Sequence, residues 1–241
     1  MDEEKLAVLR RWVDEAKRIT FFGGAGVSTE SGIPDFRSQD GLYHQQYAYP
    51  PETIISHSFY QQNPEEFYRF YRERMLFPDA KPNICHRTLA RWEREGRLLG
   101  IVTQNIDGLH QLAGSQRVWE LHGSVHRSFC TKCGRKYDLQ AFLQLGRIPK
   151  CTQCGGRVKP DVVLYEEGLD PLVIEGAVDA IRRADLLIVA GTSLVVYPAA
   201  SFLDVYQGRR LVLINKTATA RDDIADLVLH EKLGEVFERL G

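Results

Sequence analysis

Short apolar segments alternate with longer amphipathic segments along most of the chain. The apolar segments carry Ile, Val, Leu and Phe at consecutive positions, which is typical of strands buried on both faces of a parallel sheet. They cover residues 18–24, 98–107, 184–193 and 209–216. The amphipathic segments have apolar residues at helical spacing and cover residues 3–18, 86–96 and 171–183. This alternation predicts an α/β fold in which helices cover a Rossmann-like, doubly wound parallel sheet.

Two regions interrupt this alternation. One is rich in Tyr, Gln, Pro and Phe and contains a predicted helix from Pro64 to about Met75. The other contains four paired cysteines. We therefore predict one sheet domain and a smaller domain built from two insertions. The sheet domain would cover residues 1–38, 86–123 and 161–241, the helical insertion residues 39–85, and the cysteine-containing insertion residues 124–160.

The composition limits the class of protein. The chain has 241 residues, 44% hydrophobic and 26% charged, so it can bury a substantial core. Its formal net charge of -1 weighs against non-specific nucleic-acid binding. Residues 1–18 contain no apolar run long enough for a signal peptide or a membrane span. We expect a cytoplasmic monomer that binds no membrane and no specific nucleic acid.

Four of the five cysteines form two C-x-x-C pairs, with 17 residues between the pairs. They are Cys130, Cys133, Cys151 and Cys154. Glycines next to each pair favour tight turns, so the spacing predicts a zinc ribbon with four thiolate ligands. Such a site leaves no open position for water, so the zinc ion would be structural. Two disulfides are the weaker alternative, and Cys85 is expected to be a packed thiol.

A glycine-rich loop, "FFGGAGVSTESGIPDFR", follows the first predicted strand at residues 21–37. Gly24 and Gly26 match the start of the phosphate-binding turn of a nicotinamide dehydrogenase, but Thr29 replaces its third glycine. The acidic residue that would hold the ribose is absent as well. Taken alone, the loop could bind a dinucleotide or serve only for packing.

The same loop ends in Phe36 and Arg37. A guanidinium group suits a pyrophosphate, and Phe36 could cover a flat ring. An ion pair between Asp35 and Arg37 is an equally good interpretation of the spacing.

Other polar segments lie where strands are predicted to end. "AGTSLVVYPA" at residues 190–199 is a second glycine turn, and its Thr192 and Ser193 would lie on the ligand-binding edge of the sheet. "TQNIDGLHQLAG" at residues 103–114 places two amides and a carboxylate at that edge, namely Gln104, Asn105 and Asp107. His122 follows, and a general-base role is as good an interpretation as a structural one. For His126 we favour the structural role.

Together these segments resemble the sirtuin family of NAD-dependent protein-lysine deacylases, and most closely its small bacterial members. The motifs are "GAGVSTESGIPDFR", "TQNIDGLH", "ELHGS", the two C-x-x-C pairs, "GTSLVVYPA" and "INK". They occur in the family's order and span nearly the whole chain. The resemblance implies a Rossmann-like NAD-binding domain, one structural zinc ion and acyl-lysine proteins or peptides as substrates.

The resemblance also assigns roles to residues. His122 would be the general base, with Asn105 and Asp107 completing the catalytic pocket. The residues implied to bind NAD are Gly24, Ala25, Thr29, Phe36, Arg37, Gln104, Asn105, Ile106, Asp107, His122, Gly191, Thr192, Ser193, Asn215, Lys216 and Lys232. The products would be nicotinamide, O-acyl-ADP-ribose and free lysine. Because no hydride is transferred, the loop need not copy the dehydrogenase turn.

The sequence departs from the family pattern at two substrate positions. The acyl-lysine peptide is expected between two segments, one with Val163, Leu164 and Tyr165 and the other starting at Val195. In the first, Glu166 replaces a glycine, so its carboxylate could disfavour acidic peptides or face solvent. In the predicted helix, Tyr71 and Arg74 are three residues apart and could face the same way. Family members that remove succinyl or malonyl groups carry such a pair, so these groups are alternatives to acetyl.

Three competing functions remain open. A Rossmann dehydrogenase lacks support because the third glycine and the ribose acid are missing. A zinc-containing adaptor for nucleic acid or protein is a second alternative, which the near-neutral charge weakens. Mono-ADP-ribosylation of proteins is the closest alternative, since it would use the same cofactor and the same first step.

Overall fold

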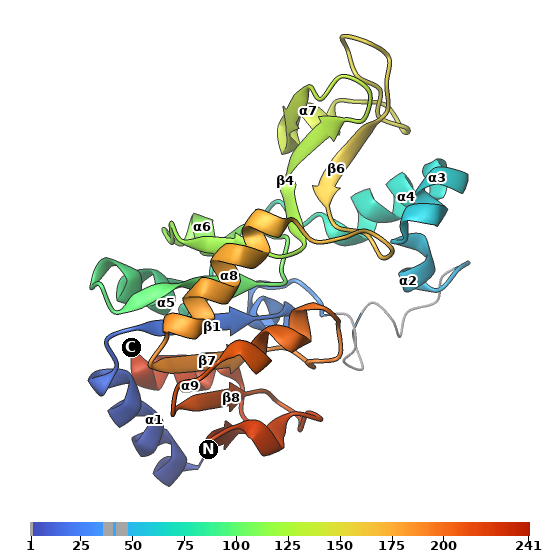
Figure 1. The fold of residues 1–241 in the computed structure, drawn as a ribbon. Coiled ribbons are helices and arrows are strands. Elements are labelled where there is room, and N and C mark those ends of the chain that lie inside the picture. The colour runs from blue at the N-terminus through green and yellow to red at the C-terminus, as the bar shows by residue number, and fades with distance from the viewer. Residues whose placement is uncertain (1, 36–40, 42–47) are drawn as a thin grey trace.

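The computed structural model describes residues 2–35, 41 and 48–241, and it contains two sheets of different size (Figure 1). The larger sheet has six strands in the order β3-β2-β1-β7-β8-β9, and every neighbouring pair is parallel. Its strands are β1 (Ile19–Gly23), β2 (Leu98–Thr103), β3 (Val118–Glu120), β7 (Leu186–Ala190), β8 (Leu211–Ile214) and β9 (Leu227–Leu229). The doubly wound parallel sheet is thus confirmed. The sequence pattern missed only the two three-residue edge strands, β3 and β9.

Helices cover both faces of this sheet. The helices along its sequence are α1 (Glu3–Glu15), α5 (Ile84–Arg94), α6 (Leu109–Leu112), α8 (Pro171–Arg183) and α9 (Leu233–Leu240). Leu9 of α1 and Trp92 of α5 share one buried cluster with Phe21 of β1. The next residue, Phe22, points to the opposite face and shares a second cluster with Ile181 of α8. Alternation along a strand explains why both neighbours are buried.

Local signals explain where the helices begin and end. The Asp2 side chain accepts a hydrogen bond from the Lys5 amide at 3.1 Å, which caps α1. The helix ends at Glu15, because Ala16 adopts an extended conformation before β1. A doubly wound unit usually has a helix after its first glycine turn. Here two single 3-10 turns, Ala25–Val27 and Thr29–Ser31, occupy that position.

The smaller sheet is antiparallel, with the strand order β5-β4-β6. Its strands are β4 (Gly123–Cys130), β5 (Lys136–Asp138) and β6 (Val158–Val162), and α7 (Leu139–Leu143) follows β5. Short helices from the other insertion complete this region: α2 (Pro51–Ile54), α3 (His57–Gln62) and α4 (Pro64–Phe70). Tyr60 and Tyr68 of these helices share one buried core with Phe142 of α7 and Val158 of β6.

The helix predicted from Pro64 to Met75 changes type within its length. It is α-helical to Phe70 and then forms one π-helical turn over Tyr71–Met75. A π turn has more residues per turn than an α-helix, so side chains three positions apart no longer share a face. In the parts of the chain that the structure describes, no helix is both long and apolar enough to cross a membrane.

Candidate active site and metal centre

The polar segments predicted to meet at one edge of the large sheet do meet there. In the strand register, Gly23 of β1 lies beside Thr103 of β2 and Ala190 of β7, and Ala190 lies beside Ile214 of β8. The residues that follow these four are Gly24, Gln104, Gly191 and Asn215. All four therefore begin loops at the carboxyl edge of the sheet, which is where open α/β folds bind ligands.

The two glycine turns touch each other. The Gly26 amide donates to the Gly191 carbonyl at 2.8 Å. A Cβ atom at Gly24 would lie 2.8 Å from that same oxygen, and one at Gly191 would lie 2.5 Å from the Val27 nitrogen. Gly191 also has φ of 60°, a left-handed conformation. These glycines are therefore needed for close backbone approach, and the packing interpretation accounts for part of their pattern.

Hydrogen bonds connect the second glycine turn to its neighbours. The Thr192 amide donates to Asn215 Oδ1 at 2.9 Å, and Asn215 Nδ2 donates to the Thr192 carbonyl at 3.0 Å. Gln104 Nε2 donates to Thr192 Oγ1 at 2.9 Å. Thr192 and Asn215 are buried. The loops after β2, β7 and β8 are thus held in one arrangement.

Ser28, which sequence reasoning did not single out, connects the glycine loop to the loop after β2. Its hydroxyl is buried, accepts from Asn105 Nδ2 at 3.1 Å and donates to Asp107 Oδ2 at 2.6 Å. The Leu109 amide donates to Asp107 Oδ1 at 2.9 Å. Burial raises the pKa of Asp107, while the bonds from Ser28 and Leu109 act in the opposite direction. The only sequence signal for Ser28 is its place directly after the glycine turn.

His122 lies next to this network with a defined orientation. Its Nδ1 lies 2.9 Å from the Gln104 carbonyl oxygen. A carbonyl can only accept a hydrogen bond, so Nδ1 carries the proton and Nε2 has a free lone pair. Burial lowers the pKa of His122, which keeps its ring neutral at neutral pH. The side chain can therefore accept a proton at Nε2.

His126 has a different environment. Its Nε2 lies 2.9 Å from the carbonyl oxygen of Asp107, and its ring is in contact with Gly108. Both contacts hold the backbone of the loop after β2. The structural role expected for His126 agrees with these contacts.

Of five other predicted cofactor contacts, three lie among the described residues and two do not. The Thr29 hydroxyl donates to the Gly26 carbonyl at 3.0 Å, so it closes the glycine turn. Ala25 begins the first 3-10 turn, and the Ile106 carbonyl accepts from the Val125 amide at 2.9 Å. Phe36 and Arg37 lie outside the described residues.

Three predicted contacts lie apart from the hydrogen-bonded network. Ser193 and Lys216 are exposed, and the Lys232 ammonium pairs with Glu235 at 3.4 Å. Within the described ranges, the structure shows no hydrogen bond from these three side chains to the network. Their role in binding a cofactor stays a prediction.

The predicted peptide segment connects the two parts of the molecule. The Val163 amide donates to the His122 carbonyl at 3.0 Å, and the Tyr165 amide donates to the Ile55 carbonyl at 3.0 Å. Leu164 is buried, whereas Tyr165 is 38% exposed. On the opposite segment, Val195 is 51% exposed. An extended peptide could therefore contact Tyr165 and Val195, while the Leu164 side chain belongs to the core.

Glu166 is exposed, which agrees with one of the two interpretations of the sequence. Its carboxylate accepts hydrogen bonds from the amide and the hydroxyl of Ser58, at 2.8 and 2.9 Å. Its φ is 75°, a left-handed conformation that glycine adopts more easily. The exposed carboxylate is thus hydrogen-bonded to α3, and its effect on acidic peptides stays a prediction.

Tyr71 and Arg74 differ in burial. The Tyr71 ring is 0% exposed and packs against Phe67 and Phe142, with ring centroids 6.1 and 5.7 Å apart. Arg74 is exposed, and both residues belong to the π turn. Their joint role in an acyl pocket stays a prediction.

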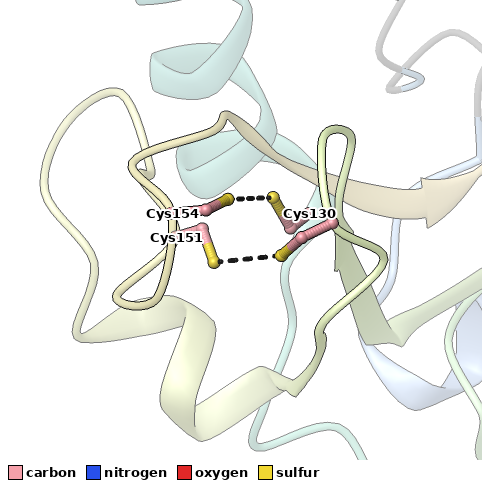
Figure 2. A group of neighbouring side chains, drawn as sticks. Cys130, Cys151 and Cys154 are labelled. Atoms are coloured by element: carbon pink, nitrogen blue, oxygen red, sulfur yellow. Dashed lines mark hydrogen bonds between the residues drawn. The ribbon is translucent and has the colours of Figure 1, made fainter.

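The four paired cysteines form one cluster at the end of the small sheet (Figure 2). All four sulfur atoms lie within 4.8 Å of one another, and none of these cysteines forms a disulfide. Cys130 Sγ lies 3.5 Å from Cys154 Sγ, and Cys133 Sγ lies 3.7 Å from Cys151 Sγ. Thiolates bound tetrahedrally at about 2.3 Å from zinc would be about 3.8 Å apart, so the cluster fits one zinc ion.

The surroundings of the cluster fit a structural site. Backbone amides of Lys132 and Gln153 donate to Cys130 Sγ and Cys151 Sγ, both at 3.4 Å, and Tyr137 donates to Cys151 Sγ at 3.2 Å. Such bonds orient thiolates that bind a metal. Cys85 is the buried thiol that was expected, and burial raises its pKa.

The fold and the site together define the class of protein. It is a doubly wound α/β protein whose loops at the carboxyl edge of the sheet are placed to bind a dinucleotide, and its four-cysteine cluster fits a metal ion. Comparison with known proteins gives the family. The profile of the Sir2 family matches residues 24–198, so the chain belongs to the Sir2 family. The resemblance to sirtuins found in the sequence is confirmed.

Individual relatives agree over almost the full length. A protein of Clostridium acetobutylicum named "NAD-dependent protein deacetylase" is 57% identical over 238 residues, covering 98% of this chain and 97% of that protein. A solved structure of Sir2 with a deacetylated p53 peptide and 3'-O-acetyl ADP ribose is 37% identical with a TM-score of 0.90, covering 98% of this chain and 96% of that one. Another, of Sir2 with a p53 peptide and NAD+, is 38% identical with a TM-score of 0.87 over the same shares of the two chains.

Proposed function

We propose that this protein is an NAD-dependent protein-lysine deacetylase. The observation that carries the proposal is the Ser28–Asn105–Asp107 network beside a neutral His122, at the edge where the two glycine turns meet. Relatives of nearly equal length, named as enzymes of this kind, support it. The substrates would be NAD and acetylated lysine side chains of proteins. The products would be nicotinamide, O-acetyl-ADP-ribose and free lysine.

The residues that would hold NAD are those at the carboxyl edge of the large sheet. When bound, NAD would supply a ribose carbon whose bond to nicotinamide can be broken, so that the acetyl oxygen can bind there. The glycine loop and the Thr192 turn would contact the phosphates and the adenosine half. Asn105 and Asp107, fixed by Ser28, would line the pocket for the ribose and nicotinamide.

His122 would act as the general base. Its Nε2 lone pair is free because Nδ1 donates to the Gln104 carbonyl, and its low pKa keeps the ring unprotonated before the reaction. The proton taken would come from a ribose hydroxyl, which then attacks the carbon of the former amide. Val163 and Tyr165 would hold the peptide on one side and Val195 on the other.

Substitution of the base tests the proposal. We expect His122→Ala to abolish the NAD-dependent conversion of acetyl-lysine to free lysine, measured by mass spectrometry with an acetyl-lysine peptide and NAD. His230 is a matched control, because it is an exposed histidine whose Nε2 pairs with Asp222 at 3.2 Å. His230→Ala should keep full activity. Full activity of His122→Ala, with unchanged zinc content and folding, would contradict the mechanism.

Removal of succinyl or malonyl groups is a second candidate for the same site. One observation favours it: among the residues that the structure describes, the buried Tyr71 hydroxyl has no hydrogen-bond partner. Arg74 lies three positions later in the same π turn, and its guanidinium group would pair with a distal carboxylate. In that case Arg74→Met should lower succinyl-peptide turnover relative to acetyl-peptide turnover. An unchanged ratio would contradict the second candidate.

Mono-ADP-ribosylation has less support, because the named relatives are deacetylases. Nicotinamide release with ADP-ribose retained on the protein substrate would establish it. The cytoplasmic location and the monomeric state stay predictions of the sequence.

A further inference from the structure

A buried polar cluster lies next to the two loops that are proposed to bind the cofactor. It consists of His86 on α5, His110 on α6 and Ser115 just after α6. His86 is 0% exposed and His110 is 1% exposed, and their ring centroids are 4.7 Å apart. The Ser115 amide donates to the His110 carbonyl at 3.1 Å. Neither histidine belongs to the site described above.

Four buried atoms of this cluster have no hydrogen-bond partner among the described residues. They are His86 Nε2, His110 Nδ1, His110 Nε2 and Ser115 Oγ. Buried polar atoms in native proteins are almost always paired, with protein or with ordered water. Four such atoms in three neighbouring residues therefore point to a bound partner.

The cap of α5 provides partners for one ring nitrogen of His86. The Asn83 amide donates to His86 Nδ1 at 3.2 Å, and Nδ1 also lies 3.0 Å from Asn83 Oδ1. Nδ1 is therefore paired in either tautomer, as the acceptor from the amide or as the donor to Oδ1, and Nε2 is the ring nitrogen left without a partner among the described residues. Burial also lowers the pKa of His86 to about 4, so the ring is neutral.

The partner has to fit this chemistry. His86 Nε2 is a donor or an acceptor according to the tautomer, and neutral His110 offers one donor and one lone pair. Among the described residues, the two histidines belong to no group of three side chains that could hold a metal ion. A water molecule can both donate and accept, so it can pair with either tautomer of His86 and with His110. We propose that His86, His110 and Ser115 bind an internal water molecule.

This water would connect the elements that carry the two cofactor loops. Asn83 Nδ2 donates to the Val27 carbonyl at 2.7 Å and to Ser31 Oγ at 3.1 Å, both in the glycine loop. On the other side, α6 begins directly after the Asp107 loop, and its Leu109 amide binds Asp107 at 2.9 Å. His86 and His110 are therefore positioning residues that fix the glycine loop relative to Asp107. This consequence rests on the proposed function, whereas the water site does not.

A structure of the full chain at better than about 1.2 Å resolution tests the site directly. We expect an ordered water about 3 Å from both His86 Nε2 and a ring nitrogen of His110. A cluster without an ordered water at this position overturns the proposal.

Kinetics test the positioning role. We expect His110→Phe, which keeps an aromatic ring without nitrogens, to raise the KM for NAD about tenfold, since a buried donor loses its partner, while kcat changes less than about twofold. His110→Gln retains a donor and an acceptor and should restore most of the affinity. A purely structural role would lower Tm and leave KM unchanged in the folded variant. Equal KM values for His110→Phe and wild type overturn the positioning role.

Two serines provide a matched pair. Ser115 and Ser128 are both buried, and neither hydroxyl has a partner among the described residues, but Ser128 lies in the small sheet. Ser115→Ala should raise the KM for NAD, whereas Ser128→Ala should not. Equal effects would overturn the positioning role even if His110→Phe does not fold. If wild type itself fails to consume NAD, the proposed function is wrong, and the crystal structure still decides the water site.

Discussion

The two sheets of this molecule are stabilised in different ways. The large sheet buries aliphatic and aromatic side chains on both faces. Helices α1, α5 and α9 together cover one of these faces. The small sheet has only three strands, and its core depends on aromatic rings from short helices and on the cysteine cluster. The core of the large sheet is stabilised by the apolar surface area that it buries. We expect the core of the small sheet to depend on the metal, because its strands and helices are short.

Removal of the metal should give the largest difference in stability between the two sheets. We expect a chelator to unfold the small sheet and to leave the large sheet folded, because structural zinc contributes about 10 kcal/mol to small metal-binding folds. Hydrogen exchange measured by region should show lost protection in β4 to β6 and retained protection in β1 and β7. Cys151→Ser should act similarly, and Cys85→Ser, outside the cluster, should keep one zinc ion per chain. Retained protection of β4 to β6 without zinc would refute this dependence.

A cavity in the large sheet should have the opposite effect. Ile188 of the central strand β7 is fully buried, so Ile188→Ala should lower the free energy of unfolding by about 2–5 kcal/mol without loss of zinc. Urea denaturation and a zinc assay measure the two quantities. Leu172→Ala is the control, because Leu172 is 76% exposed. An equal effect of the two variants would show that burial does not hold the large sheet.

Acid should weaken the large sheet through its buried histidines. The pKa of His86 is 6.5 in an unfolded chain and about 4 in the fold, because burial disfavours the charged ring. The unfolded chain therefore binds more protons between these values, and this contribution to stability is complete above pH 6.5 and is lost as the pH falls toward about 4. The shift corresponds to about 3 kcal/mol at most. His110 and His122 act in the same direction.

The measurement is urea denaturation at several pH values, compared with His86→Gln. The variant should show a weaker loss of stability between pH 6.5 and about 4. An identical pH dependence would mean that His86 does not titrate in this way.

The smallest expected effect concerns the junction between the small sheet and α3. The bonds from Ser58 to Glu166 are exposed, so Glu166→Gln or Ser58→Ala should cost less than about 1 kcal/mol each. A double-mutant cycle should give a coupling energy of about 0.5 kcal/mol between them. No coupling would mean that the contact does not form in solution. Glu166→Gly should be tolerated, because glycine accepts the positive φ.

How much the sequence predicted depends on how local each feature is. The strand at residues 186–190 and the helix at 171–183 follow from their own patterns. Consecutive apolar residues predict a strand buried on both faces of a sheet, and apolar residues at helical spacing predict a helix that packs against it. The edge strands β3 and β9 were missed, since three residues carry too little pattern. The turn to a π-helix at Tyr71 was missed as well, because the spacing of its residues does not distinguish a π turn from an α-helical one.

By itself, the sequence determined the parallel sheet, the cysteine module and the family, because these depend on spacing within short segments. Only the tertiary structure decided that Ser28 joins Asn105 to Asp107, that Glu166 binds Ser58, and that His86 and His110 meet. In the chain, Ser58 and Glu166 are 108 residues apart, and the two histidines are 24 residues apart. Ser28 is 77 residues from Asn105 and 79 from Asp107. Contacts at such separations form when the sheet brings loops to one edge, and no local pattern records them.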